Sequence, residues 1–156
     1  MIHLDKDGDN KIETLTEMRG LIFSDVMYAA SEPKRLYEEI IDQGKLSDSV
    51  NESLEEYNIL EEKPMPIVLF GFAIEHLLII SRLLKLPGGN GLLVGVGGSG
   101  RQSLTRLASK IAGMKTISIE LSKAYDLECW REDLKRVLTS SGGHNLPTAE
   151  LAGYMN

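Results

Sequence analysis

The spacing of apolar residues predicts helices in the first half of the chain. Apolar side chains recur three and four positions apart between polar joints, which is the period of an amphipathic helix. The groups are Leu15, Met18, Leu21 and Ile22, then Leu36, Tyr37, Ile40 and Ile41, and then Val50, Leu54 and Tyr57. We therefore expect short helices with polar joints over residues 13–60, whose apolar stripes are packing surfaces.

A longer apolar stretch follows the proline-containing break at residues 63–66. Residues 67–85 are apolar almost all round, which predicts a helix buried between layers of the fold. A membrane span is the alternative, but Glu75, His76 and Arg82 leave uninterrupted runs that are too short to cross a bilayer. We therefore expect a buried helix and no membrane association.

A strand, a glycine-rich turn and a helix are predicted next. Leu92, Leu93 and Val94 form a continuous apolar run, which is typical of a parallel strand covered on both faces. Ile117 and Ile119 alternate with polar residues and indicate a second strand. With the intervening helix, the two strands would make a right-handed βαβ unit. The expected ranges are 92–94 and 115–121 for the strands. A helix begins after the glycine-rich turn and continues over 104–112, a further helix spans 126–138, and 139–156 is a divergent, flexible tail.

The glycine-rich turn has the spacing of a phosphate-binding loop. Gly95 and Gly100 match the two glycines of the pattern G-x-x-x-x-G-K-[ST]. Glycines permit positive φ and let backbone amides approach a ligand, and the following helix presents the positive end of its dipole. The candidate nucleotide-binding residues are Gly95, Val96, Gly97, Gly98, Ser99, Gly100, Arg101, Gln102 and Ser103. A glycine-rich turn that binds no ligand is the alternative interpretation.

The end of this motif departs from the pattern at two positions. Arg101 stands where a lysine would reach the phosphates, and an arginine keeps the charge but has a different shape. Gln102 stands where a Ser or Thr hydroxyl would hold Mg²⁺, and Ser103 comes one residue late. We therefore expect phosphate binding to survive better than hydrolysis, and Mg²⁺ is only weakly supported as a cofactor.

Composition excludes some classes of function. The 156 residues carry 17 basic and 23 acidic side chains, for a net charge of -6, which argues against nonspecific binding of nucleic acid. The one cysteine, Cys129, excludes an internal disulfide and fits a reducing compartment. Its expected role is that of a small buried apolar residue.

An acidic turn over residues 1–17 resembles the start of an EF-hand calcium loop. Asp5, Asp7 and Asp9 occupy the first three ligand positions. Thr16, however, stands where a bidentate glutamate is required. One interpretation is a weak calcium site, and the other is a solvated turn that caps the following helix. The pattern favours the capping turn.

Residues 95–108 resemble the P-loop of the fourth AAA+ module of axonemal dynein heavy chains, which carries the same Arg-Gln-Ser ending. The resemblance covers about residues 18–138. It implies an α/β fold: a partial AAA+ (P-loop NTPase) module with a βαβ core over residues 64–138. An α-helical connector from the preceding module would come before it, over residues 18–63. The flanking segments that share it are 18–25, 55–58, 69–76 and 122–134.

The resemblance also implies a ligand and a cellular setting. The ligand would be ATP or ADP, with residues 87–90 lining the adenine pocket. The chain would be a small piece of a microtubule-based motor of cilia and flagella. Its partners would be the remainder of the dynein heavy chain ring, the intermediate and light chains, and microtubules. Its location would be the cytoplasm, at the ciliary or flagellar axoneme.

Hydrolysis of ATP by this chain alone is not expected. A module of this family continues into a third strand that ends in acidic residues, which hold Mg²⁺ and orient the attacking water. After Leu138 the sequence has no apolar strand followed by an Asp or Glu pair. The alternative function is a structural or calcium-binding interaction segment whose P-loop is vestigial.

Overall fold

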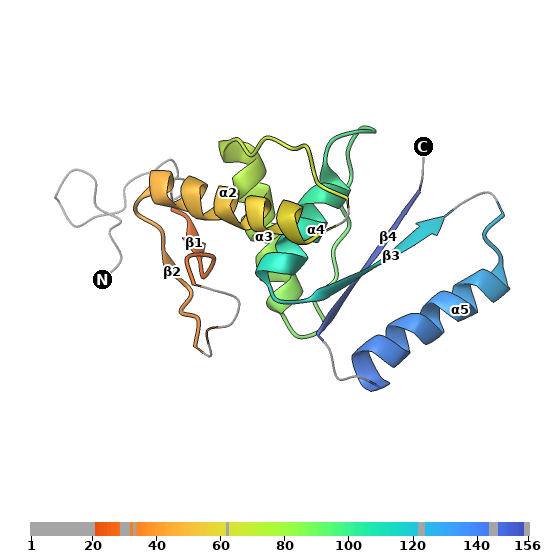
Figure 1. Ribbon diagram of the computed structural model, residues 1–156. Coiled ribbons are helices and arrows are strands. Elements are labelled where there is room, and N and C mark those ends of the chain that lie inside the picture. The colour runs from red at the N-terminus through yellow and green to blue at the C-terminus, as the bar shows by residue number, and fades with distance from the viewer. Residues whose placement is uncertain are drawn as a thin grey trace, which may run out of the picture.

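The structure is a computed structural model. It describes residues 21–28, 32, 34–61, 63–121, 124–143 and 147–154. Figure 1 shows the helices α2, α3 and α4 gathered together, the strands β3 and β4 beside α4, and α5 apart from the three helices. The elements in chain order are β1 (Phe23–Ser24), β2 (Glu38–Glu39), α2 (Gln43–Leu60), α3 (Gly71–Lys85), α4 (Arg101–Ile111), β3 (Lys115–Leu121), α5 (Leu127–Leu138), the π-helical turn η1 (Thr139–Gly143) and β4 (Thr148–Tyr154).

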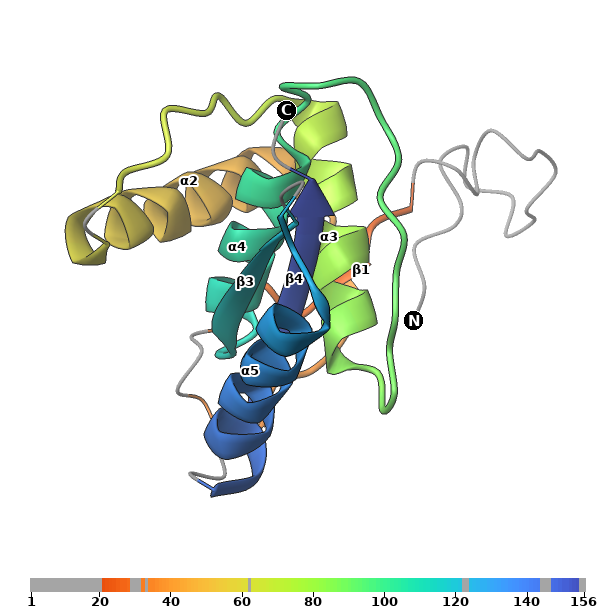
Figure 2. The ribbon, with the colours of Figure 1, turned by 90° about the vertical axis from the view of Figure 1, so that its right-hand side faces the viewer.

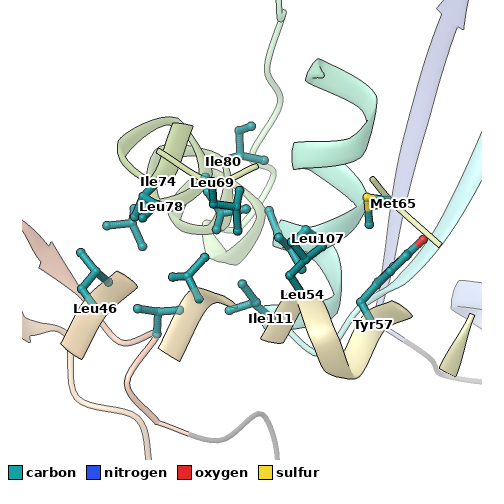
Figure 3. Close-up of a cluster of buried hydrophobic side chains, with 14 residues drawn as sticks. Leu46, Leu54, Tyr57, Met65, Leu69, Ile74, Leu78, Ile80, Leu107 and Ile111 are labelled. Carbon is teal, nitrogen blue, oxygen red and sulfur yellow. The ribbon is translucent and has the colours of Figure 1, made fainter. Parts of the chain in front are cut away.

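The hydrophobic core lies between α2, α3 and α4 (Figure 3). Each helix contributes one apolar stripe, and Val50, Leu77 and Leu107 are completely buried. Removing these side chains from water is the main force that holds the three helices together. The buried members of the cluster are Val26, Leu46, Val50, Leu54, Tyr57, Met65, Leu69, Ile74, Leu77, Leu78, Ile80, Leu107, Ala108 and Ile111.

Helix α2 confirms the last stripe of the predicted connector. Asp42 caps its start, since the Asp42 carboxylate accepts a hydrogen bond from the Lys45 amide at 3.1 Å. The buried side chains are Leu46, Val50, Leu54 and Tyr57, which recur at helical spacing. The glutamate-rich opposite face is left to solvent, so burial follows the amphipathic pattern.

The earlier part of the connector was predicted as helical, and this prediction is wrong for residues 34–41. The chain is extended there, and β1 and β2 pair antiparallel. Leu36, Tyr37 and Ile41, three members of the predicted stripe, are exposed. The hairpin continues beyond the strands, because the Ile40 amide donates to the Ile22 carbonyl at 2.7 Å. The helical spacing of apolar residues at 36–41 covers only one turn, and backbone pairing with residues 22–24 outweighs it.

Helix α3 was expected over residues 67–85 with burial on all sides, but it begins at Gly71 and buries one face. Ile74, Leu77 and Leu78 enter the core, whereas Phe72 and Ile79 are exposed. One face is buried because α2 and α4 both pack against it, and the three helices share one core cluster.

No helix within the described ranges is both long enough and apolar enough to cross a membrane.

The segment before the glycine-rich turn was predicted as a strand, but it pairs with no strand among the described residues. It is extended and runs back alongside α3 to the start of α4 (Figure 2). Leu92 is 89% exposed and Val94 is 83% exposed, so the expected burial on both faces is also wrong. An extended segment becomes a strand only when a neighbouring chain supplies the ladder of hydrogen bonds.

The predicted βαβ unit had strands at 92–94 and 115–121, but the parallel sheet forms between β3 and β4. Strands β3 and β4 pair parallel over their whole length, from Lys115 opposite Thr148 to Leu121 opposite Tyr154. Helix α5 joins them, so the βαβ unit is β3–α5–β4. The tail at 139–156, expected to be flexible, instead contains η1 and β4. Ala149 is buried, so β4 gains both a backbone partner and an apolar contact.

Helix α5 carries its own start signal but packs loosely. The Asp126 carboxylate accepts a hydrogen bond from the Cys129 amide at 2.9 Å, which caps the helix and lowers the pKa of Asp126. None of the helix residues is buried. Trp130, expected as a packing anchor, is 46% exposed, and Cys129 is exposed rather than buried.

Candidate phosphate-binding site

The glycine-rich turn adopts the backbone conformation that its glycines allow. Gly98 has φ 75° and Gly100 has φ 72°, both in the left-handed region that residues with a Cβ avoid. A Cβ built at either position would meet no atom within 4 Å. These two glycines are therefore required by backbone conformation, and the space beside them is open to a ligand.

Gly95 is required for a different reason, which is close approach. A Cβ at Gly95 would lie 3.1 Å from the Ser99 hydroxyl oxygen and 3.5 Å from Arg101 Cδ. The side chains that follow in the loop thus fold back over the Gly95 backbone. The loop is closed tightly at Gly95 and open at Gly98 and Gly100.

The loop leads into the N-terminus of α4. Gly100 is the N-cap, and no side chain makes a capping hydrogen bond to the first turn. The backbone amides of Arg101, Gln102 and Ser103 therefore stand at the positive end of the helix without a capping side chain. An uncapped helix N-terminus after a glycine turn fits an anionic group such as phosphate.

Arg101 brings a positive charge to the same place. Its Nη1 donates to the Leu93 carbonyl at 3.3 Å, and its Nη2 donates to the Val96 carbonyl at 3.1 Å. The guanidinium therefore lies against the loop rather than extending into solvent. A cation in this position complements the amides, because both attract an anion to one spot.

The loop is held on both sides by the core. Leu93 before it and Leu104 after it are partly buried and pack against the core cluster. Leu107 and Ala108, one turn further along α4, are completely buried. The rigid placement of α4 therefore fixes where its N-terminus and the loop stand.

The residues fit a phosphate better than a magnesium ion. Gln102, at the position of the expected hydroxyl, is exposed, and Ser103 is half-buried. Thr105 is buried, and its hydroxyl donates to the Arg101 carbonyl at 2.9 Å. Among the described residues, no group of three or more His, Cys, Asp or Glu side chains could hold a metal ion.

Other predicted sites fall partly or wholly outside this region. The calcium candidates Asp5, Asp7 and Asp9 lie outside the described residues. The expected adenine segment, residues 87–90, is a turn after α3 in which Asn90 donates to the Gly88 carbonyl at 2.8 Å. Its role toward adenine stays a prediction.

One feature was missed because no motif signals it. Asp25 in the connector forms ion pairs with Arg35 and with Lys85 at the end of α3. Arg35 also donates to the Ile111 carbonyl at the end of α4, at 2.9 Å. The contacts join residues up to 76 positions apart, so only the folded chain reveals them.

The sequence around the candidate site matches a known protein family. Residues 65–151 match the family described as the P-loop containing dynein motor region D4. The match continues past Leu138, where the sequence resemblance was expected to stop, and reaches into β4. The part of the fold that holds the glycine-rich loop is therefore the part that the family shares.

Curated relatives agree over a wider range. The chain is 46% identical to human dynein axonemal heavy chain 12 over 134 residues, which are 85% of this chain and 4% of that protein. It is 45% identical to mouse dynein axonemal heavy chain 1 over 127 residues, 81% of this chain and 3% of the relative. Mouse dynein axonemal heavy chain 3 is 43% identical over 142 residues, 91% of this chain and 3% of the relative. The chain belongs to the axonemal dynein heavy chain family, and it carries the P-loop-containing D4 part of the motor region.

Proposed function

We propose that this chain is a partial AAA+ module that binds ATP or ADP through residues 95–103. The observation that carries the proposal is the uncapped N-terminus of α4, preceded by two glycines at positive φ. These features place several backbone donors beside open space. A core helix supports them, so their geometry is set before any ligand arrives.

Each part of the loop has a distinct task in this proposal. The amides of Gly98 and Gly100 and of the first turn of α4 donate to phosphate oxygens. The guanidinium of Arg101 leaves the carbonyls of Leu93 and Val96 and turns to the phosphates. The carbonyls that it gives up are neutral acceptors, whereas a phosphate adds its own negative charge and accepts two parallel hydrogen bonds from a guanidinium. The exchange therefore favours the bound state.

Binding without hydrolysis is the expected activity of the chain by itself. Phosphoryl transfer needs a carboxylate that holds metal and a group that orients water, in addition to the phosphate loop. The second half of β4 reads Leu151-Ala152-Gly153-Tyr154, which contains no carboxylate. The chain therefore has the elements that hold a nucleotide, and the end of β4 offers no carboxylate that could activate water.

The relatives, of which this chain spans 3–4% of the length, support a proposal about its wider setting. We propose that the segment works inside a longer microtubule motor of the ciliary or flagellar axoneme. Its partners there are the remainder of the heavy chain ring, the intermediate and light chains, and the microtubule. The identity of 46% to a human axonemal heavy chain supports this setting.

The test is an ADP titration of the whole chain followed by ¹⁵N–¹H correlation NMR. We expect the amide signals of Gly97, Gly98 and Gly100 to shift, and Arg101→Ala to abolish these shifts. Arg131→Ala is the matched control, because Arg131 is an exposed arginine on α5. A wild-type spectrum that ignores ADP would overturn the proposal.

A further inference from the structure

We infer that this site holds its nucleotide without magnesium, with the Arg101 guanidinium supplying the positive charge that a metal ion supplies in other phosphate loops. The inference rests on the proposed function and adds a specificity to it. The ligand is then a metal-free nucleoside polyphosphate.

The first support is the place of the Arg101 side chain. Its donors lie 3.1 Å from the Val96 carbonyl inside the loop and 3.3 Å from the Leu93 carbonyl before the loop. Its Cδ lies 3.5 Å from where a Cβ of Gly95 would stand. The charge is thus already gathered at the loop before a ligand binds. A guanidinium also offers a planar fork of donors that matches two phosphate oxygens, which a lysine ammonium does not.

The second support is the side chain at the metal-holding position. Gln102 is exposed in the first turn of α4 and offers a neutral amide oxygen. Mg²⁺ is bound in nucleotide sites through carboxylates, substrate phosphates and water, at short distances and in strict octahedral geometry. A long, solvated glutamine does not fix an oxygen with that precision. Position 102 therefore supplies no well-placed oxygen ligand for Mg²⁺.

Nearby hydroxyl groups do not replace the missing one. Ser103 is one residue further along α4, and successive residues of a helix point about 100° apart. Its hydroxyl consequently cannot take the direction of a hydroxyl at position 102. Thr105 is buried, and its hydroxyl is already bonded to the Arg101 carbonyl. Neither side chain stands where the metal would be held.

The third support is the acidic side of a magnesium site. A carboxylate at the end of a neighbouring strand normally completes the coordination. The last four residues of β4 are Leu151, Ala152, Gly153 and Tyr154, and none of them is acidic. The hydroxyl is thus replaced by glutamine at position 102, and the last four residues of β4 supply no carboxylate.

The experiment compares ADP binding to the whole chain in Mg²⁺ and in EDTA by isothermal titration calorimetry. We expect the two dissociation constants to agree within about threefold, because Arg101 rather than the metal neutralises the phosphates. Arg101→Gln removes the charge and is expected to weaken binding in EDTA by about tenfold or more, as loss of a charge-assisted bidentate contact does.

A pair of variants at position 102 sharpens the test. Gln102→Thr restores the hydroxyl, and we expect Mg²⁺ then to strengthen ADP binding by about tenfold over EDTA. Gln102→Ala is the matched control, since it removes the amide without adding a hydroxyl. It is expected to stay insensitive to Mg²⁺.

The outcomes separate this inference from the proposed function. Wild-type binding that collapses in EDTA would overturn the inference and leave the nucleotide site standing. Binding in neither condition, with a folded chain by circular dichroism, would overturn both. A Gln102→Thr variant that ignores Mg²⁺ would overturn the role given to position 102.

Discussion

Lys85 Nζ lies 2.6 and 2.7 Å from the two carboxylate oxygens of Asp25, although 60 residues separate the two side chains. The Asp25 side chain is only 10% exposed and that of Lys85 is 25% exposed. Arg35 Nη1 approaches the same carboxylate at 3.7 Å. One buried anion therefore fastens the extended connector to the last turn of α3, where a cation also complements the helix dipole.

Asp25→Asn is predicted to destabilise the fold by about 2–4 kcal/mol, since it leaves two cations in partly buried positions without their anion. Urea denaturation followed by circular dichroism measures the change. Asp48→Asn serves as the control, because Asp48 is exposed on α2. Equal effects of the two substitutions would show that the Asp25 pairs contribute nothing specific.

Leu107→Ala is predicted to cost about 2–5 kcal/mol of unfolding free energy, the range for truncating a buried leucine. Leu107 is completely buried between the helices, so the substitution leaves a cavity beneath the candidate site. Leu138→Ala removes the same atoms from a side chain that is 66% exposed, and it is expected to change stability by less than about 0.5 kcal/mol. A similar loss in both variants would contradict the packing described for α4.

Gly100→Ala is predicted to lower stability by about 1–2 kcal/mol through backbone strain, because Gly100 has φ 72°. The substitution introduces no clash, since the space beside Gly100 is open. Thermal unfolding measures the effect. Gly142→Ala is the control, at a glycine that also has open space and is not among those with positive φ. If both variants melted alike, strain at position 100 would be excluded.

Tyr125 is predicted to ionise well above an ordinary tyrosine. Desolvation of the phenol and its hydrogen bond to the Asp133 carboxylate, at 2.8 Å, raise the pKa of Tyr125 from 10.0 to about 12. The folded state thus favours the neutral phenol. The stabilisation is complete below pH 10 and is lost as the pH rises from about 10 to about 12.

Tyrosinate absorbance, taken as the difference between wild type and Tyr125→Phe, isolates this one titration. We expect Asp133→Asn to move its midpoint back toward 10, because both the acceptor and the negative charge are lost. An unchanged midpoint would rule out Asp133 as a cause of the shift.

Local patterns predicted the parts of the fold that depend on nearby residues. The stripe Val50, Leu54 and Tyr57 gave α2, and the alternation of Ile117 and Ile119 gave β3. The glycine spacing placed the turn and the start of α4. In each case the information lies within a few residues, since helical period, strand alternation and positive φ are local properties.

The predictions that failed depend on distant parts of the chain. The apolar run at 92–94 lacks a strand beside it, and residues 148–154 became a strand because β3 offered them an edge. No local sequence pattern predicts the ion pair of Asp25 and Lys85, which are 60 positions apart. Pairing of strands and of charges is decided by the topology, which hydrophobic spacing does not encode.

The contacts of Arg101 have a thermodynamic consequence for the segment before the loop. Its guanidinium occupies the carbonyl of Leu93, an acceptor that a neighbouring strand would use, and the carbonyl of Val96 inside the loop. In the proposed bound state, a phosphate draws the guanidinium away and frees the Leu93 carbonyl for a neighbouring strand. Under the proposed function, nucleotide binding and the pairing of a strand with Leu93 are linked, and each strengthens the other by the same free energy.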